Sequence, residues 1–177
     1  MGAPFWGRKG RVKEVKPNCE STHASFRLMG ASLNPKIITK ILRIQPSMSH
    51  RKGDAYKVRL GRGDGYRTLF FREGLWVLDT EEKLKSSNLE RHLAFLVDRL
   101  ESHSTFLNST RFRKDVYCVW VSRYGHGGPD LSSSILARLG RLGIGLSFDF
   151  YYSGSILMNY LSPPEGGSHK VGSHNSS

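Results

Sequence analysis

The chain shows one order of apolar patterns twice, and this repeat constrains the fold more than any other feature of its 177 residues. In residues 23–46, an alternating apolar segment leads through a glycine-containing turn into an amphipathic segment, and residues 116–152 repeat the same order. A shift of 98 positions (131 minus 33) places Leu33 on Leu131. The same shift also superimposes most apolar positions of the second segment: Ile37 on Ile135, Ile38 on Leu136, Ile41 on Leu139 and Ile44 on Leu142. The repeat therefore predicts two strand–helix units packed together.

Three segments have the apolar spacing of helices. Asn34 is a favourable N-cap and Pro35 suits the first helical position, where its missing N–H costs nothing. The predicted apolar stripes are Ile37, Ile38, Ile41 and Leu42 in the first helix; Leu89, Leu93, Leu96, Val97 and Leu100 in a helix from 89 to about 102; and Leu131, Ile135, Leu136, Leu139 and Leu142 in a helix beginning at Pro129 or Asp130. Gly143 is expected to end the last of these.

Alternating or short apolar runs predict the strands. These runs lie at 23–29, 56–60, 66–71, 75–78, 116–121 and 146–152. We expect 66–71 and 75–78 to pair as a hairpin, 61–65 to form a turn, and 45–54 to be a loop. The mixture of strands and short helices predicts a single α+β domain with a mixed or antiparallel sheet and helices packed on one face.

Composition divides the chain into three parts and suggests its setting. Residues 1–22 are predicted to be a flexible basic arm, 23–161 the domain, and 162–177 a disordered tail. No apolar run approaches the ~20 residues that span a bilayer, so no membrane association is expected. Two cysteines make a disulfide framework improbable, which favours a cytoplasmic protein. The sequence leaves the oligomeric state open.

The charge distribution points to an acidic partner. The formal net charge is +12, and residues 36–72 contain ten basic residues against two acidic ones. Such a basic face attracts polyanions or an acidic protein surface. A net charge far from zero is also an ordinary means of keeping a small domain soluble.

Candidate binding residues concentrate in this basic region. They are His50, Arg51, Lys52, Asp54, Arg67, Arg72 and Trp76. In the loop at 49–54, arginine offers planar donors for a phosphate or carboxylate. The structural alternative is a solvated turn in which Asp54 acts as a cap and Gly53 adopts a positive φ.

No motif specifies a reaction. The segment Gly61–Gly65 lacks the Gly-Lys-Ser/Thr ending of a phosphate-binding loop, and neither a serine nucleophile elbow nor a metal-ligand spacing occurs. The chain is therefore predicted to be a non-enzymatic binding protein without a cofactor or metal. One alternative is a nucleic-acid-binding protein, since cations alternate with aromatic residues between Tyr56 and Arg72. Another is a small enzyme acting on an anionic ligand, with His50, Arg51 and Asp54 at its site.

An ordered set of phrases resembles a bacterial family, the domain-of-unknown-function family forty-two seventy-nine. The phrases are Asn34-Pro35-Lys36-Ile37-Ile38-Thr39-Lys40-Ile41-Leu42 with Ile44 and Pro46, Ser49-His50-Arg51-Lys52-Gly53-Asp54, Leu75-Trp76, Leu89-Glu90-Arg91-His92-Leu93, and residues 131–142 followed by Gly143-Ile144 and Phe148-Asp149-Phe150-Tyr151. The resemblance covers about residues 24–152, apart from the basic segment 56–72. It implies a small α+β domain of bacterial origin and supplies no activity. By analogy, such a protein would block an acidic surface, as toxin-neutralising immunity proteins do.

Overall fold

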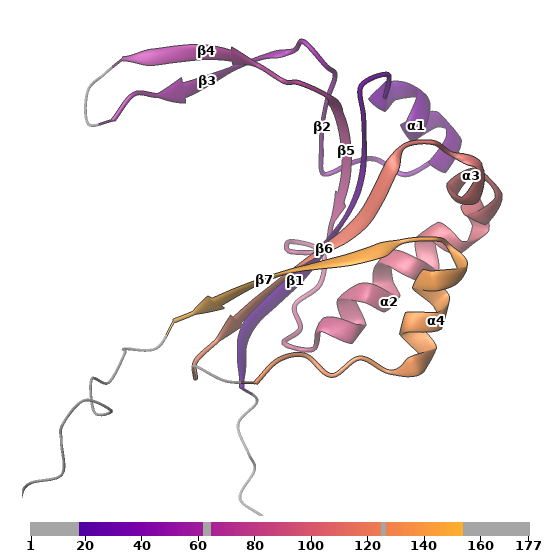
Figure 1. The fold of residues 1–177 in the computed structure, drawn as a ribbon. Coiled ribbons are helices and arrows are strands. Elements are labelled where there is room, and N and C mark those ends of the chain that lie inside the picture. The colour runs from indigo at the N-terminus through magenta and orange to yellow at the C-terminus, as the bar shows by residue number, and fades with distance from the viewer. Residues whose placement is uncertain (1–17, 62–64, 125–126, 154–177) are drawn as a thin grey trace, which may run out of the picture.

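The protein is a single α+β domain built on a five-stranded mixed sheet. The computed structural model describes residues 18–61, 65–124 and 127–153. The strand order is β2-β5-β1-β6-β7, and a separate two-stranded hairpin leaves the sheet (Figure 1). The strands of the sheet are β1 (Cys19–Gly30), β2 (Met48–His50), β5 (Gly74–Asp79), β6 (Arg113–Ser122) and β7 (Gly145–Tyr152). The predicted class and sheet type are confirmed.

β1 lies at the centre of the sheet, and its alternation turns successive side chains to opposite faces. Ala24, Phe26 and Leu28 are fully buried on the apolar face. Ser25 and Arg27 point to the other face. β1 pairs antiparallel with β5 and with β6, whereas β6 and β7 are parallel.

The helices all lie on the apolar face of the sheet, and the opposite face, called the open face below, carries none of them (Figure 1). They are α1 (Pro35–Leu42), α2 (Leu89–Leu100), the 3₁₀ turn η1 (Glu101–His103), α3 (Ser104–Ser109) and α4 (Ser133–Arg141). The core forms between helices and sheet and includes Phe26, Trp76, Leu93 and Leu96. In the described part of the chain, every helix is too short or too polar to cross a membrane.

α2 matches its sequence prediction closely. The Asn88 side chain caps it by accepting a hydrogen bond from the Glu90 N–H at 2.9 Å. All five predicted apolar positions of this helix are buried. His92 is buried beside them: its Nε2 donates to the carbonyl oxygen of Ser86 at 3.0 Å and its Nδ1 lies 2.7 Å from the Thr80 hydroxyl. This pair of contacts fixes the start of α2 against the end of β5.

The two strand–helix units expected from the repeat are present. β1 leads into α1 and β6 leads into α4, and the helices are capped by Asn34 and Ser132, which the 98-residue shift superimposes (132 minus 34). β1 and β6 pair antiparallel, with Phe26 opposite Val116, so an approximate twofold relates the units. The units differ in the position of the strand after each helix, since β7 lies beside β6 but β5 separates β2 from β1.

The buried residues of α1 and α4 are not the pairs that the 98-residue shift superimposes. In α1, Ile38 and Leu42 are buried, but Ile37 and Ile41 are 56% and 40% exposed. In α4, Ile135, Leu139 and Leu142 face the core, while Leu136 is 45% exposed. Both short helices rest against the sheet along a narrow stripe, so the broad apolar stripes predicted from spacing do not all reach the core.

Three other local predictions are wrong. The predicted loop at 45–54 contains strand β2, which pairs with β5. The segment 66–70 pairs with 55–59 rather than with β5, which lies between β1 and β2. α4 begins at Ser133, after Pro129 and Asp130, because Ser132 caps it: its hydroxyl accepts a hydrogen bond from the free N–H of Ile135 at 3.3 Å.

The first strand also extends the domain toward the N-terminus. β1 starts at Cys19, so residues 19–22, assigned from sequence to the flexible arm, pair with the end of β6. The remainder of that arm, the element considered at 156–161 and the tail at 162–177 lie outside the described residues.

Candidate functional site: a basic hairpin beside a sheet-face cavity

The hairpin formed by β3 (Ala55–Arg59) and β4 (Tyr66–Phe70) projects from the sheet on the side away from the helices (Figure 1). We call residues 55–70 the basic hairpin. Among its described residues, 55–61 and 65–70, every side chain except Leu69 is exposed and no residue is acidic. A two-stranded hairpin without a covered face is marginally stable by itself. Its sequence is therefore better suited to a contact surface than to a core.

Strand register assigns the hairpin residues to two faces. Lys57 pairs with Thr68 and Arg59 with Tyr66, so these side chains share one face. Phe70 lies on the same face, opposite Ala55. The other face carries Tyr56, Val58, Arg67 and Leu69. Tyr66 and Phe70 are 64% and 63% exposed, which is unusual for aromatic side chains in a domain of this size.

The base of the hairpin is fixed to the sheet by a stack of three rings. The His50 ring lies 3.4 Å from that of Phe71, centroid to centroid, with the planes 8° apart. Phe71 in turn stacks on Tyr56 at 4.4 Å. His50 is half-buried, and its Nδ1 has no hydrogen-bond partner among the described residues. The stack connects β2 to the first residues of the hairpin.

Polar residues of the predicted binding loop form hydrogen bonds that stabilise the turn. Asp54 accepts a hydrogen bond from the backbone N–H of Arg51 at 2.7 Å, and Gly53 has a φ of 86°. The Arg51 guanidinium donates to the Asn34 side chain at 2.9 Å. Lys52 is exposed at the tip of this turn. The structural alternative, a turn capped by Asp54, therefore describes the loop geometry.

Trp76 does not belong to the exposed surface and corrects the predicted residue set. It is fully buried on the helix side of β5, and its indole N–H donates to the Thr39 hydroxyl at 3.0 Å. Trp76 was predicted to be a binding residue, but alternation along β5 turns it into the core. Arg51, Asp54 and Trp76 consequently do not converge on a pocket.

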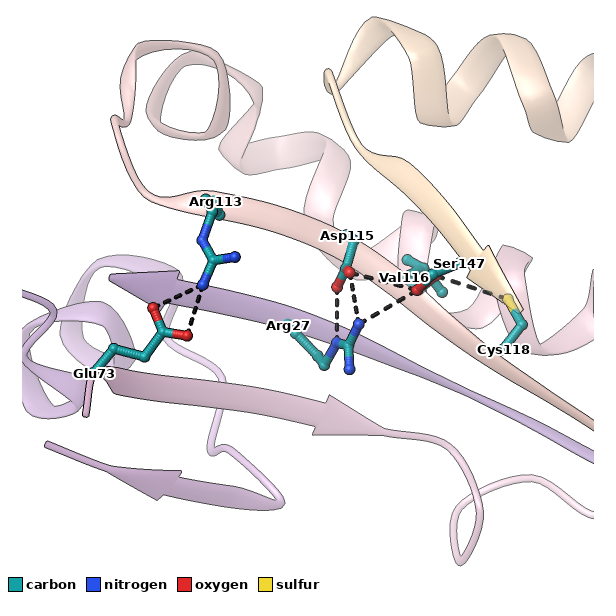
Figure 2. Close-up of polar contacts among 7 residues, drawn as sticks. All are labelled: Arg27, Glu73, Arg113, Asp115, Val116, Cys118 and Ser147. Atoms are coloured by element: carbon teal, nitrogen blue, oxygen red, sulfur yellow. Dashed lines mark hydrogen bonds and ion pairs between the residues drawn. The ribbon is translucent and has the colours of Figure 1, made fainter. Parts of the chain in front are cut away.

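The open face carries a polar cluster that the sequence did not reveal. Arg27 donates to both oxygens of Asp115, at 2.8 and 2.6 Å, and to the Ser147 hydroxyl at 3.3 Å (Figure 2). The guanidinium also lies over the Tyr117 ring, 4.6 Å from its centroid. The hydrogen bond to Asp115 raises the pKa of Arg27 above its ordinary value. Three strands thus hold one guanidinium in a fixed orientation.

A second polar group continues the cluster toward β7. The hydroxyls of Tyr117 and Tyr151 donate to the same carboxylate oxygen of Asp149, at 2.6 and 2.7 Å. These bonds lower the pKa of Asp149 and raise that of Tyr117 to about 12. The phenols therefore remain protonated donors at neutral pH.

A cavity of about 650 Å³ lies between this open face and the base of the basic hairpin. We call it the sheet-face cavity. Its apolar lining comes from β1, β2, β5 and the hairpin base, and its polar lining includes two predicted residues, His50 and Arg72. The apolar residues are Met29, Met48, Phe71, Leu75 and Val77. The remaining predicted residue, Arg67, lies on the hairpin away from the lining.

The thiols of the described chain are not activated nucleophiles. Burial raises the pKa of Cys118 to about 12, and burial likewise raises that of Cys19. Both remain thiols at neutral pH, whereas the thiolate is the reactive form. Across the described residues, His, Cys, Asp and Glu side chains do not gather in groups of three or more that could hold a metal ion.

A family model for a domain of unknown function, DUF4279, matches residues 20–153, which covers β1 to the end of β7. The chain belongs to the DUF4279 family. The DUF4279 match includes the basic hairpin, which the phrase-by-phrase resemblance had left out. No curated protein and no solved structure matches the chain significantly.

What the sequence missed in this DUF4279 domain is the open face. Arg27 and Asp115 are 88 residues apart, and only the β1–β6 register makes them neighbours. A usable signal existed in β1, because a charged residue between Phe26 and Leu28 must point away from the core. Its partner could not be chosen from sequence without the register.

Proposed function

We propose that this chain is a non-enzymatic binding protein whose basic hairpin engages an acidic surface of a partner protein. The observation that carries the proposal is the exposure of cations and apolar rings together on a projecting hairpin. Tyr66, Phe70 and Val58 are exposed there alongside Lys57 and Arg67. Aromatic residues and arginine are enriched where proteins contact one another.

The turn at 51–54 and Arg72 extend this surface at the base of the hairpin. Arg51, Lys52 and Arg72 are exposed. Charge of this kind accelerates encounter with an acidic partner and sets orientation, while the apolar rings supply most of the affinity. An immunity-like role, in which the partner is an acidic toxin, is one setting in which such a surface would act.

A test compares two triple variants with the same change in charge. K57E/R59E/R67E reverses the hairpin cations, and K36E/K40E/R91E reverses three exposed cations of α1 and α2. We expect a partner recovered by affinity purification with the wild-type chain to be retained by the helix variant and lost by the hairpin variant. The purified pair is then titrated by calorimetry. Equal binding by both variants would contradict the proposal.

A second candidate function is binding of single-stranded nucleic acid. It is favoured by one observation: Lys57, Arg59, Tyr66 and Phe70 share one hairpin face, where phosphate contact and base stacking would occur together. The presence of the exposed Val58 on the other face favours a protein partner instead, because aliphatic side chains do not stack on bases.

Fluorescence anisotropy with a labelled single-stranded oligonucleotide of mixed sequence separates the two functions. Nucleic-acid binding predicts an affinity whose logarithm falls steeply with the logarithm of salt concentration and which K57E/R59E/R67E abolishes. Absence of binding at low salt would exclude this candidate and leave the protein-binding proposal in place.

A further inference from the structure

The sheet-face cavity is a second site, which shares only Arg72 with the surface of the proposed function. Its floor is the open face of β1, β5 and β2, and the hairpin base, with Phe71 and Arg72, borders it. A volume of about 650 Å³ exceeds the space that one protruding side chain fills and falls within the range of small-molecule sites. The size therefore favours a free organic ligand over a single anchor residue of a partner.

The middle of the cavity is apolar. Met29 lies opposite Leu75 in the β1–β5 pairing, and Met48 lies opposite Val77 in the β2–β5 pairing. Two methionines in one lining give a surface that adapts its shape, because the side chain is unbranched and polarisable. An apolar chain or ring would displace water from this surface, which is favourable roughly in proportion to the apolar area that it buries.

Arg27 provides a fixed donor beside the apolar centre. Its Nε and Nη2 are used by Asp115 and Ser147, but Nη1 points away from them and makes none of the marked contacts (Figure 2). A guanidinium already held by Asp115 and by the Tyr117 ring loses little entropy when it binds a ligand. The group that it can accommodate is an acceptor, and most favourably a carboxylate.

The other charged residues of the lining are two carboxylates that already accept hydrogen bonds and one arginine. Glu73 is occupied by Arg113, which donates to both of its oxygens at 2.6 and 2.7 Å (Figure 2). Asp79 accepts from the Ser25 hydroxyl and from the Glu81 N–H. Arg72, by contrast, has no acidic partner among the described residues. Arg72 and Nη1 of Arg27 are therefore the cationic donors that a ligand in the cavity can reach.

We propose that the sheet-face cavity binds an amphipathic organic anion, an apolar chain or ring system that carries one carboxylate. The apolar body lies along Met29, Met48, Leu75 and Val77, and the carboxylate faces Nη1 of Arg27 with Arg72 nearby. This site is independent of the hairpin cations, so failure of either proposal leaves the other standing.

The test is displacement of a fluorescent aromatic sulfonate, 8-anilinonaphthalene-1-sulfonate, from the full chain. Decanoate, decanol and decylammonium share one alkyl chain and differ only in the head group. We expect saturable binding of the probe and displacement by decanoate at concentrations about tenfold or more below those needed for decanol or decylammonium. Methyl signals of Met29 and Met48, assigned with methionine-to-leucine variants, should shift with decanoate.

Variants locate the site. Leu75→Glu places a carboxylate in the apolar lining and should weaken decanoate binding by about tenfold or more. Leu136→Glu makes the same change on an exposed residue of α4 and should leave binding unchanged. The pair R27M/D115L removes donor and partner together, and should reduce the preference for decanoate over decanol. Replacing residues 55–70 by Asn-Gly retains the lining and should retain binding, which excludes the hairpin rings as the probe's site.

Several results would overturn the proposal. They are an absence of saturable probe binding, equal displacement by decanoate and decanol, preference for decylammonium, equal effects of Leu75→Glu and Leu136→Glu, and loss of binding when the hairpin is replaced. If Leu75→Glu does not fold, the decision rests on R27M/D115L and on the methionine signals.

Discussion

At the scale of single residues, Asp149 shows how the open face is stabilised by hydrogen bonds rather than by burial. Two phenol hydroxyls donate to its carboxylate and lower its pKa below the ordinary value of 3.8. A group whose pKa is lower in the folded state contributes stability above the unfolded-state pKa and loses it as the pH falls through the folded-state pKa. The contribution of Asp149 is thus complete at neutral pH and disappears in acid.

We therefore expect Asp149→Asn to lower the melting temperature at pH 7 by a few degrees, and the difference from the wild type to shrink as the pH falls below about 4. Thermal denaturation followed by circular dichroism between pH 7 and pH 3 measures this. Asp130→Asn, at an exposed carboxylate, is the matched control and should give a small difference at every pH. A difference in melting temperature between Asp149→Asn and the wild type that stays constant with pH would contradict this prediction.

At the scale of elements, the start of β5 is limited by close backbone approach. A Cβ added at Gly74 would lie 2.6 Å from the carbonyl oxygen of Leu33 and 3.2 Å from that of Gly30. Neither obstacle is a flexible side-chain end, so β5 or the turn before α1 would have to move. In α4, by contrast, a Cβ at Gly140 would meet nothing within 4 Å.

Substitution by alanine should change the unfolding free energy in opposite directions at these two glycines. Gly74→Ala is expected to cost about 1–3 kcal/mol of unfolding free energy, the usual cost of overpacking. Gly140→Ala should add about 0.5–1 kcal/mol, because alanine favours a helix interior. Urea denaturation of the two variants beside the wild type measures both. Destabilisation of similar size in both would show that the close approach at Gly74 is not the cause.

At the scale of the whole molecule, the basic hairpin is attached to the domain with little shared core. Gly53 and Asp54 already pair with Phe71, through N–H to carbonyl bonds of 2.8 and 3.0 Å. Asn-Gly in place of residues 55–70 would close this pair as a two-residue turn. The replacement leaves the core residues of β5, Trp76 and Leu78, unchanged.

We expect the shortened chain to fold and to melt within a few degrees of the wild type, since a change of about 1 kcal/mol shifts the melting temperature by 2–4 °C in a domain of this size. It should also lose the partner that K57E/R59E/R67E loses. Circular dichroism gives the first result and calorimetric titration the second. An unfolded product would show that the hairpin belongs to the cooperative core.

Sequence patterns determined the local elements because their causes are local. The caps at Asn34 and Asn88, the apolar stripe of α2 and the alternation in β1 act within a few residues, and each gave the element that was predicted. The repeat likewise indicated two strand–helix units. Only the tertiary structure decided which apolar residues of α1 and α4 face inward, that β5 lies between β1 and β2, and that Trp76 is buried.

The same division applies to the candidate site. The exposure of Lys57 and Arg67 is a consequence of residue type, since lysine and arginine are almost never fully buried without a partner. The Arg27–Asp115 pair and the sheet-face cavity depend on strand register, and a shift of one residue would turn these side chains to the other face. That register is set by packing of residues far apart in the chain, which no local pattern encodes.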